Sequence, residues 1–181
     1  ITITDPPGAF SMNAPGLEAC AGDNFCVDFI AGEFTFIQGV QFSITYSATD
    51  LNFTNVNNIN VGIPGLTVAS FNASSGVVTL QWTGNSGVSL APNSTLFSLC
   101  FSKLTDNPTT VSVSGTSTPI VITDSNGNGV VYSGGNTQLS CTPPLPLEFG
   151  QVNIVNLTCA DTPSGSITIV NMINGSGNYT Y

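Results

Sequence analysis

The stretch Val40-Gln41-Phe42-Ser43-Ile44-Thr45-Tyr46 alternates apolar and polar side chains without interruption. Because successive side chains of a strand point to opposite faces, this order predicts a strand with one face buried and the other in water. No amphipathic helix pattern competes with it anywhere in the chain. The same period of two recurs in shorter runs, at residues 25–29, 78–82, 97–101, 111–113 and 120–122. Short alternating strands separated by turns predict an all-β chain folded as a jelly-roll or Ig-like β-sandwich.

One turn sequence carries possible ligands for a cation. Asp124, Asn126 and Asn128 stand at alternate positions before Gly129, as at the start of a calcium loop. The twelfth position of such a loop needs an acidic residue, and here it is Gly135. A glycine-rich hairpin turn explains the same residues. The sequence therefore favours a turn, with a Ca²⁺ site as the alternative.

The charge pattern removes several classes of function. Only 6% of the residues are charged, against roughly a quarter in an average globular domain. Lys103 is the only basic residue, there is no histidine, and the net charge is −9. Nucleic acids and anionic lipid surfaces both require clusters of Lys and Arg, so neither is an expected partner. The absence of a run of about 18 apolar residues likewise predicts no membrane insertion.

The sequence also contains few residues that could carry out catalysis. Without histidine, Ser-His-Asp and Cys-His catalysis and histidine metal sites are excluded. The carboxylates of Glu18, Asp23, Asp28 and Glu33 are the candidates for a glycosidase pair, but their spread along one strand and its flanks favours solvated surface positions. Trp82 shares the phase of the apolar residues in its run, which places it in the core rather than on a sugar. We predict no catalytic residues and no enzyme activity.

Five cysteines, Cys20, Cys26, Cys100, Cys141 and Cys159, show no CxxC spacing and favour disulfides in an oxidising compartment. The first four allow three pairings, and at least one bridge is expected. Alternation points Cys26 and Cys100 away from the apolar face, which conflicts with an inter-sheet bridge between them unless a bulge shifts the phase. Cys20 with Cys26 closes a feasible short loop and leaves Cys100 for Cys141. Cys159 is unpaired here, with a partner beyond residue 181 or as a buried free thiol.

Proline-rich stretches divide the chain into segments. Three prolines follow Thr142 within the run Pro143-Pro144-Leu145-Pro146, which predicts an extended linker. The opening Ile1-Thr2-Ile3-Thr4-Asp5 is strand-like, unlike a signal peptide, and runs into Pro6-Pro7. We therefore expect an excerpt of a longer protein, with targeting information outside it. The predicted segments are 1–10, the last strand of a preceding module with its linker; 11–141, a β-sandwich; 142–150, a linker; and 151–181, the first strands of an incomplete second module.

Residues 11–141 resemble cohesin-like domains. The matching stretches are Gly22-Asp23-Asn24-Phe25-Cys26-Val27-Asp28-Phe29, residues 39–46, and Asp50-Leu51-Asn52-Phe53. Leu96-Phe97-Ser98-Leu99-Cys100-Phe101 resembles the "LFxLCF" strand of cohesin-like modules in secreted Bacteroidota proteins, and residues 118–124 resemble a following strand. This resemblance implies a jelly-roll sandwich of about nine strands. True cohesins bind dockerins.

The tail resembles a different family. Val155-Asn156-Leu157-Thr158-Cys159, residues 164–169 and residues 177–181 are similar to the start of SprB-type repeats, and residues 1–5 look like the last strand of one. Such repeats occur in tandem in giant gliding adhesins exported by the type IX secretion route. The resemblance implies an extracellular protein on a bacterial cell surface. Cys159 lacks the later cysteine that these repeats usually supply.

Together these features predict a structural or adhesive module of a large secreted surface adhesin or filament, acting in attachment, gliding or contact with prey or substrate. Its expected partners are neighbouring modules of the same repeat protein and other copies in a homo-oligomer. The alternative is a recognition module that binds a dockerin-like protein or a glycan through one sandwich face. That alternative requires a specific exposed surface, which the sequence does not mark.

Overall fold

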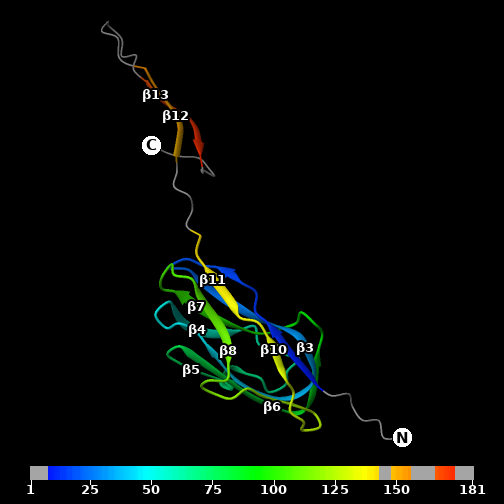
Figure 1. Ribbon diagram of the computed structural model, residues 1–181. Coiled ribbons are helices and arrows are strands. Elements are labelled where there is room, and N and C mark those ends of the chain that lie inside the picture. Colours follow the sequence, from blue (N-terminus) through cyan, green and yellow to red (C-terminus); the bar gives the residue numbers. More distant parts are fainter. Residues whose placement is uncertain (1–7, 143–147, 156–165, 174–181) are drawn as a thin grey trace. The chain divides into compact units, whose positions relative to one another are not determined.

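A computed structural model describes residues 8–142, 148–155 and 166–173 of the chain. The chain divides into two compact units, Ile1–Thr142 and Pro143–Tyr181. The first unit is an all-β sandwich (Figure 1). Within the described ranges the only helix is the single 3-10 turn η1 (Val68–Ser70), and no helix there is long and apolar enough to cross a membrane.

The sandwich is built around one long strand, β3 (Asn24–Thr45), which pairs with five others. The strands before it are β1 (Ala9–Asn13) and β2 (Leu17–Glu18). Those after it are β4 (Leu51–Asn57), β5 (Phe71–Ser74), β6 (Val77–Leu90), β7 (Thr95–Lys103), β8 (Thr109–Ser114), β9 (Val121–Asp124), β10 (Tyr132–Gly134) and β11 (Thr137–Ser140).

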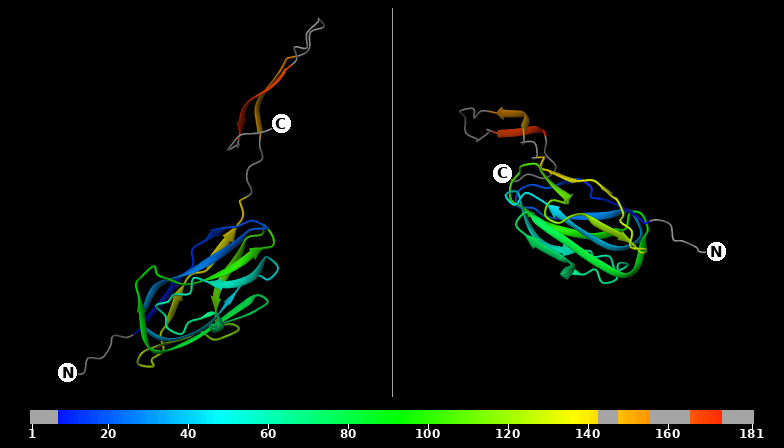
Figure 2. Two further views of the ribbon diagram at one scale, coloured as in Figure 1. Left: turned by 180° about the vertical axis from the view of Figure 1, so that it is seen from behind. Right: turned by 60° about the horizontal axis from the view of Figure 1, so that its bottom comes forward.

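β3 belongs to both layers of the sandwich (Figure 2). Its first part, through Ile30, pairs with β7, which in turn pairs with β4; we call this the β7 layer. Its second part, from Ile37, pairs with β6 and β9, and β6 pairs with β5; we call this the β6 layer. Between the two parts the register shifts and Phe36 has a φ of 53°. The runs at 25–29 and 40–46 that alternation predicts as two strands are therefore one strand, bent by a left-handed residue.

The core lies between the two layers. Phe42 and Ile44 of β3 are fully buried, as are Leu99 and Phe101 of β7. Trp82 is 4% exposed, and its indole N–H donates to the Pro64 carbonyl at 2.9 Å, so the residue sits in the core as its phase predicts. Burial of one large apolar side chain stabilises a fold by about 1.5–3 kcal/mol, so this interface contributes substantially to the stability of the unit.

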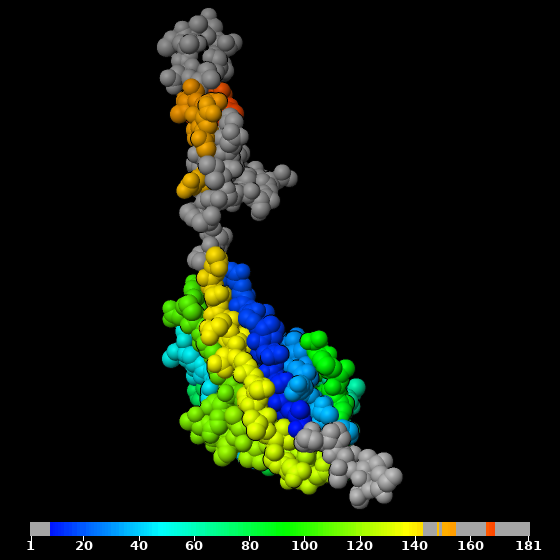
Figure 3. All heavy atoms as spheres, turned by 45° about the vertical axis from the view of Figure 1, so that its right-hand side comes forward, coloured from blue at the N-terminus to red at the C-terminus, as the bar shows by residue number. Residues whose placement is uncertain are grey.

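The first and last strands of the sandwich run side by side in the same direction, which Figure 3 shows as adjacent blue and yellow bands. β1 is parallel to β10, and β2 is parallel to β11. β1 begins at Ala9, inside the segment 1–10 that the sequence assigns to a preceding module. Phe10 and Met12 explain the difference, because both are buried on one face of β1. The strand predicted at residues 1–5 lies outside the described residues.

Two disulfides join Cys20 to Cys141 and Cys26 to Cys100. The pairing predicted from loop length, Cys20 with Cys26 and Cys100 with Cys141, is wrong. The outward phase of Cys26 and Cys100 does not prevent their pairing, because β3 and β7 are neighbours in one layer. The two residues face each other in the register, with 3.9 Å between their Cα atoms, so the bridge is cross-strand rather than inter-sheet.

In the second unit, β12 (Glu148–Val155) and β13 (Ser166–Ile173) form an antiparallel two-stranded sheet. β12 begins within the segment 142–150 that the sequence assigns to the linker. Ile154 faces Ile167 in the register, and these side chains are 66% and 72% exposed. Cys159 and most of the SprB-like motif lie outside the described residues.

Candidate functional site

The outer surface of the β7 layer is closed by links between its own side chains. Three successive outward positions of β3 each bind the residue opposite on β7. Ser102 Oγ donates to Asn24 Oδ1 at 2.6 Å, the Cys26–Cys100 disulfide follows, and Ser98 Oγ donates to Asp28 Oδ1 at 2.6 Å. We call this surface the closed face. Its polar groups are engaged within the protein and offer little to a partner.

The outer surface of the β6 layer is different, and we call it the open face. Its side chains come from alternate positions of four strands, in antiphase to the core residues Phe42 and Leu80. They are Gln41, Ser43, Thr45, Asn72, Val77, Thr79, Gln81, Thr83, Val121 and Thr123.

Facing pairs on the open face are not linked to each other. Gln41 lies opposite Gln81, and Ser43 lies opposite Thr79. Within the described part of the chain, no side chain–side chain hydrogen bond joins either pair. Gln81 and Thr83 are exposed. Their amide and hydroxyl groups therefore remain free to donate to and accept from a bound molecule.

One edge of the open face is bordered by the loop between β8 and β9. Ser43 Oγ donates to the Ser114 carbonyl at 2.8 Å and accepts from the Thr118 backbone N–H at 3.3 Å, so the loop is tied down on β3. The loop leads into Ile120 and Val121, which are 36% and 48% exposed. The open face thus combines a polar centre with an apolar border on a fixed backbone.

No side chain of the open face carries a charge, although the chain has a net charge of −9. A charged group must lose its hydration when a partner covers it, and the centres of protein–protein interfaces are accordingly depleted in charge. A neutral array of Thr, Gln, Ser and Asn avoids that penalty. The composition of the open face therefore suits burial against another macromolecule.

The Asp124 turn is closed by hydrogen bonds to one carboxylate. Asp124 accepts from the backbone N–H groups of Asn126 and Asn128 at 2.8 and 2.9 Å, and from the Asn128 side-chain amide at 3.1 Å. These bonds, that from the Asn128 backbone foremost, hold the pKa of Asp124 below its ordinary value. Because Asn128 turns its NH₂ group toward Asp124, the two side chains do not converge as oxygen ligands. The geometry supports the hairpin-turn interpretation over a Ca²⁺ loop.

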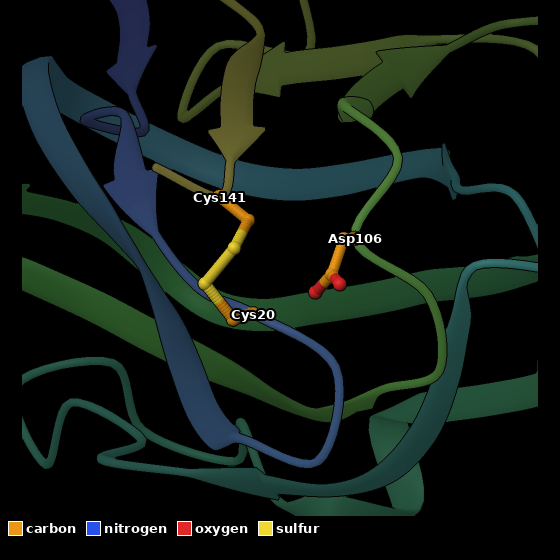
Figure 4. A group of neighbouring side chains, drawn as sticks. All are labelled: Cys20, Asp106 and Cys141. Atoms are coloured by element: carbon orange, nitrogen blue, oxygen red, sulfur yellow. A yellow bond between two sulfur atoms is a disulfide. The ribbon is translucent and has the colours of Figure 1, made fainter. Parts of the chain in front are cut away.

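Cys20, Asp106 and Cys141 form a second cluster, with ligand atoms within 4.8 Å of one another (Figure 4). The two sulfurs are joined in a disulfide, and metals bind the thiolate form of cysteine. Asp106 Oδ1 accepts from the Ala21 N–H at 2.7 Å. The cluster therefore has a structural role, because its disulfide links the turn after β2 to the end of β11.

Three of the four acidic residues considered for catalysis accept hydrogen bonds in separate parts of the fold. Glu18 accepts from the Thr142 N–H, Asp23 from the Cys20 N–H, and Asp28 from Ser98. These contacts direct the carboxylates to different partners.

The sequence reasoning did not identify the open face, although a signal for it exists. The polar phase of residues 40–46 contains only Gln41, Ser43 and Thr45, and that of residues 78–83 contains Thr79, Gln81 and Thr83. Solvent-facing strand positions usually include Lys or Glu. Because only 6% of the chain is charged, an uncharged outer phase is common in this sequence, and it indicates a contact surface only once the strands are known to be neighbours.

No family model matches the sequence, and no curated protein matches it. Solved structures do resemble the sandwich. The sixth cohesin from scaffoldin B of Acetivibrio cellulolyticus, solved in complex with a dockerin, has a TM-score of 0.60 at 19% identity, covering 74% of this chain and 99% of its own. A non-cellulosomal cohesin from Archaeoglobus fulgidus has a TM-score of 0.62 at 17% identity, covering 75% and 92%. The cohesin CaCohA2 from Clostridium acetobutylicum has a TM-score of 0.62 at 15% identity, with the same coverages of 75% and 92%.

The first unit has a cohesin-like β-sandwich fold. This confirms the fold class predicted from alternation and from the resemblance of residues 22–29, 39–46 and 96–101. At identities below 20% the likeness establishes the fold, and function has to be argued from the surface.

Proposed function

We propose that the chain carries a non-catalytic protein-recognition module of a secreted cell-surface protein, and that the open face binds its partner. The observation that carries this proposal is the contrast between the two outer surfaces. Facing side chains bind each other on the closed face, whereas on the open face the facing pairs are uncharged and are not bonded to each other. The fold adds support, because the Acetivibrio cellulolyticus cohesin was solved in complex with a dockerin. A small dockerin-like protein module is the proposed partner, and a glycan is the alternative occupant.

The two disulfides support an extracellular location. Disulfides persist in oxidising compartments and are rare in the cytosol. Here they close loops spanning 121 and 74 residues, and such loops stabilise a fold by restricting its unfolded chain. We place the module on the outside of a bacterial cell, in agreement with the resemblance to secreted Bacteroidota modules.

Site-specific photo-crosslinking tests the binding face. A benzophenone side chain at Gln81 reports on the open face, and the same group at Asn24 of the closed face is the matched control. Each protein is incubated with the secreted proteins and the surface polysaccharides of the source organism and irradiated. We expect one discrete cross-linked protein from position 81, no equivalent product from position 24, and loss of the product when Gln41 is changed to Arg. Equal products from both positions would overturn the assignment, and a polysaccharide product would favour the glycan alternative.

The second unit favours a second candidate, a structural or adhesive module of a large surface adhesin with SprB-type repeats. An isolated two-stranded sheet is marginal in water, and the exposed side chains of Val152, Ile154 and Ile167 need a cover. We propose that adjoining repeats or another copy supply it by strand addition. Hydrogen exchange separates the possibilities. Residues 148–173 should be protected in a chain extended by the neighbouring repeat and unprotected in residues 142–181 alone, whereas protection of the isolated piece would contradict the proposal.

A further inference from the structure

The chain enters and leaves the sandwich along one line. β1 and β2 run parallel to β10 and β11, with Phe10 beside Tyr132 and Leu17 beside Leu139. Gly8, at the start of this path, contacts Asp124 through its N–H at 3.5 Å. Cys20, at the end of the path, is bonded to Cys141, immediately before the residues that leave the sandwich. The exit point is thus fastened covalently to the twentieth residue.

The two disulfides are nested. The outer bridge spans 121 residues and the inner bridge, Cys26–Cys100, spans 74 residues within it. A force applied to the chain on both sides of the sandwich therefore has a short covalent route: from Gly8 along β1 and β2 to Cys20, across the disulfide to Cys141, and out. Residues 21–140 lie outside this route.

We propose that the outer disulfide gives the module a mechanical function: it carries tension through the protein and keeps residues 21–140, most of the sandwich, out of the load path. This function concerns the whole unit and is independent of ligand binding. It suits any chain that is held at one side of this module and pulled at the other.

The geometry of the loaded segment limits how far the module lengthens. Residues 9–13 and 17–18 are already strands, which rise about 3.3 Å per residue against a maximum of about 3.6 Å. β1 also pairs along its length with β3 and β10. These hydrogen bonds are loaded together in shear, because β1 is pulled along its own axis past β3 and β10, which lie outside the route. Tension is therefore carried by covalent bonds in a segment that is already almost fully extended.

The same load path protects the open face from unfolding, an inference that rests on the proposed function. Every strand of the open face, namely the second part of β3 with β5, β6 and β9, lies within the bypassed residues 21–140. The face therefore keeps its shape under load. A partner bound there experiences a folded site at forces that extend unprotected domains.

Single-molecule force spectroscopy on the full chain, held at its two ends, tests the load path. The oxidised wild type should lengthen by less than about 2 nm from the sandwich. In C20S/C141S the outer bridge is lost and the inner one remains; the difference between 121 and 74 residues then releases about 47 residues, roughly 17 nm. With a reductant added, the full 121 residues are released, roughly 44 nm. C26A/C100A is the matched control, which retains the outer bridge and should release no more than the wild type. Extension of residues 143–181 is common to every chain.

Reduction under load keeps the test decisive if C20S/C141S does not fold. With tris(2-carboxyethyl)phosphine added to the folded wild type at constant force, the outer bridge is loaded first. The chain should lengthen in two ordered steps, of roughly 17 nm and then roughly 27 nm as the 74-residue loop opens. A release of 17 nm or more from the oxidised wild type, or the same trace from wild type and C20S/C141S, would overturn the proposal. Either result leaves the cross-linking test of the open face unaffected, so the two proposals fail separately.

Discussion

The closed and open faces are made by the same strand and differ in what lies opposite its outward side chains. On the closed face β3 presents Asn24, Cys26 and Asp28 to partners on β7 that bind them. On the open face it presents Gln41 and Ser43 to Gln81 and Thr79, which do not. Sheet pairing is complete in both layers, so backbone hydrogen bonding does not distinguish them. The two layers differ in whether the facing outward side chains bind each other.

This difference implies a division of tasks across the sandwich. Links on the closed face hold β3 and β7 in register and contribute to stability. Exposed side chains on the open face, such as Gln81 and Thr83, contribute little to stability because their polar groups exchange protein contacts for water at small net free energy. Groups that are dispensable for folding are the ones available for binding.

Loss of the covalent link should have the largest effect on the closed face. We expect C26A/C100A to lower the free energy of unfolding by about 4 kcal/mol, because the 74-residue loop then adds entropy to the unfolded chain. Urea denaturation without reductant measures the change. Equal stability of variant and wild type would show that the link does not form or does not constrain the unfolded state.

Removal of one hydrogen-bonded link is the next test. Ser98 is fully buried, donates to Asp28 and accepts from Asn58 Nδ2 at 3.0 Å. We expect Ser98→Ala to destabilise the protein by about 1–3 kcal/mol, since a charged acceptor and an amide lose their partner. Thr83→Ala, at an exposed position of the open face, is the matched change and should alter stability by no more than about 0.5 kcal/mol. Similar losses at both positions would remove the distinction between the faces.

Acid should weaken the β7 layer through Asp50, the residue immediately before β4. Asp50 accepts hydrogen bonds from Ser47, Thr105 and Asn107 and thereby joins the loop before β4 to the loop after β7. These bonds, led by that from Ser47, lower its pKa from 3.8 to about 2. Since the folded pKa is the lower one, the ionised form favours folding. This contribution is complete above a pH of about 4 and is lost as the pH falls through about 2.

Urea midpoints at pH 7 and pH 2.5 measure that contribution. Acidification should lower the midpoint of the wild type more than that of Asp50→Asn, which cannot ionise at this position. A wild type and variant that respond equally to acid would assign the loss to other carboxylates.

The sequence predicts the fold well because the fold depends on alternation, and alternation is local. Phe42, Ile44, Leu80, Trp82 and Leu99 are buried in the phase that their runs indicate. The pairing of cysteines was predicted wrongly because it depends on which strands are neighbours. Loop length favoured Cys20 with Cys26, whereas contact between β3 and β7 brings Cys26 to Cys100. The short strands β10 and β11 were missed for a related reason, since they are held by pairing with distant strands.

The candidate site was less predictable than the fold because it depends on which residues lie opposite each other on neighbouring strands and on whether they bind each other. The identities of Gln81 and Thr83 do not show whether the residues opposite them form hydrogen bonds with them. The uncharged phase of two strands is visible in the sequence, but that these strands are neighbours is not. The fold must therefore be known before the surface can be distinguished from ordinary solvent-facing residues.

The smallest effect on stability should accompany the largest effect on binding. Gln41 and Gln81 face each other at the centre of the open face, and within the described residues their side chains do not bond to each other. We expect Q41A/Q81A to change the free energy of unfolding by no more than about 0.5 kcal/mol, as for surface substitutions generally. The same pair of changes should abolish cross-linking from a benzophenone placed at Thr83, because amide groups at the centre of an interface are those that a partner must find. N24A/S102A, which removes a link of the closed face, is the opposite case and should reduce stability while leaving cross-linking intact. If Q41A/Q81A destabilised the protein and N24A/S102A abolished capture, the roles of the two faces would be reversed.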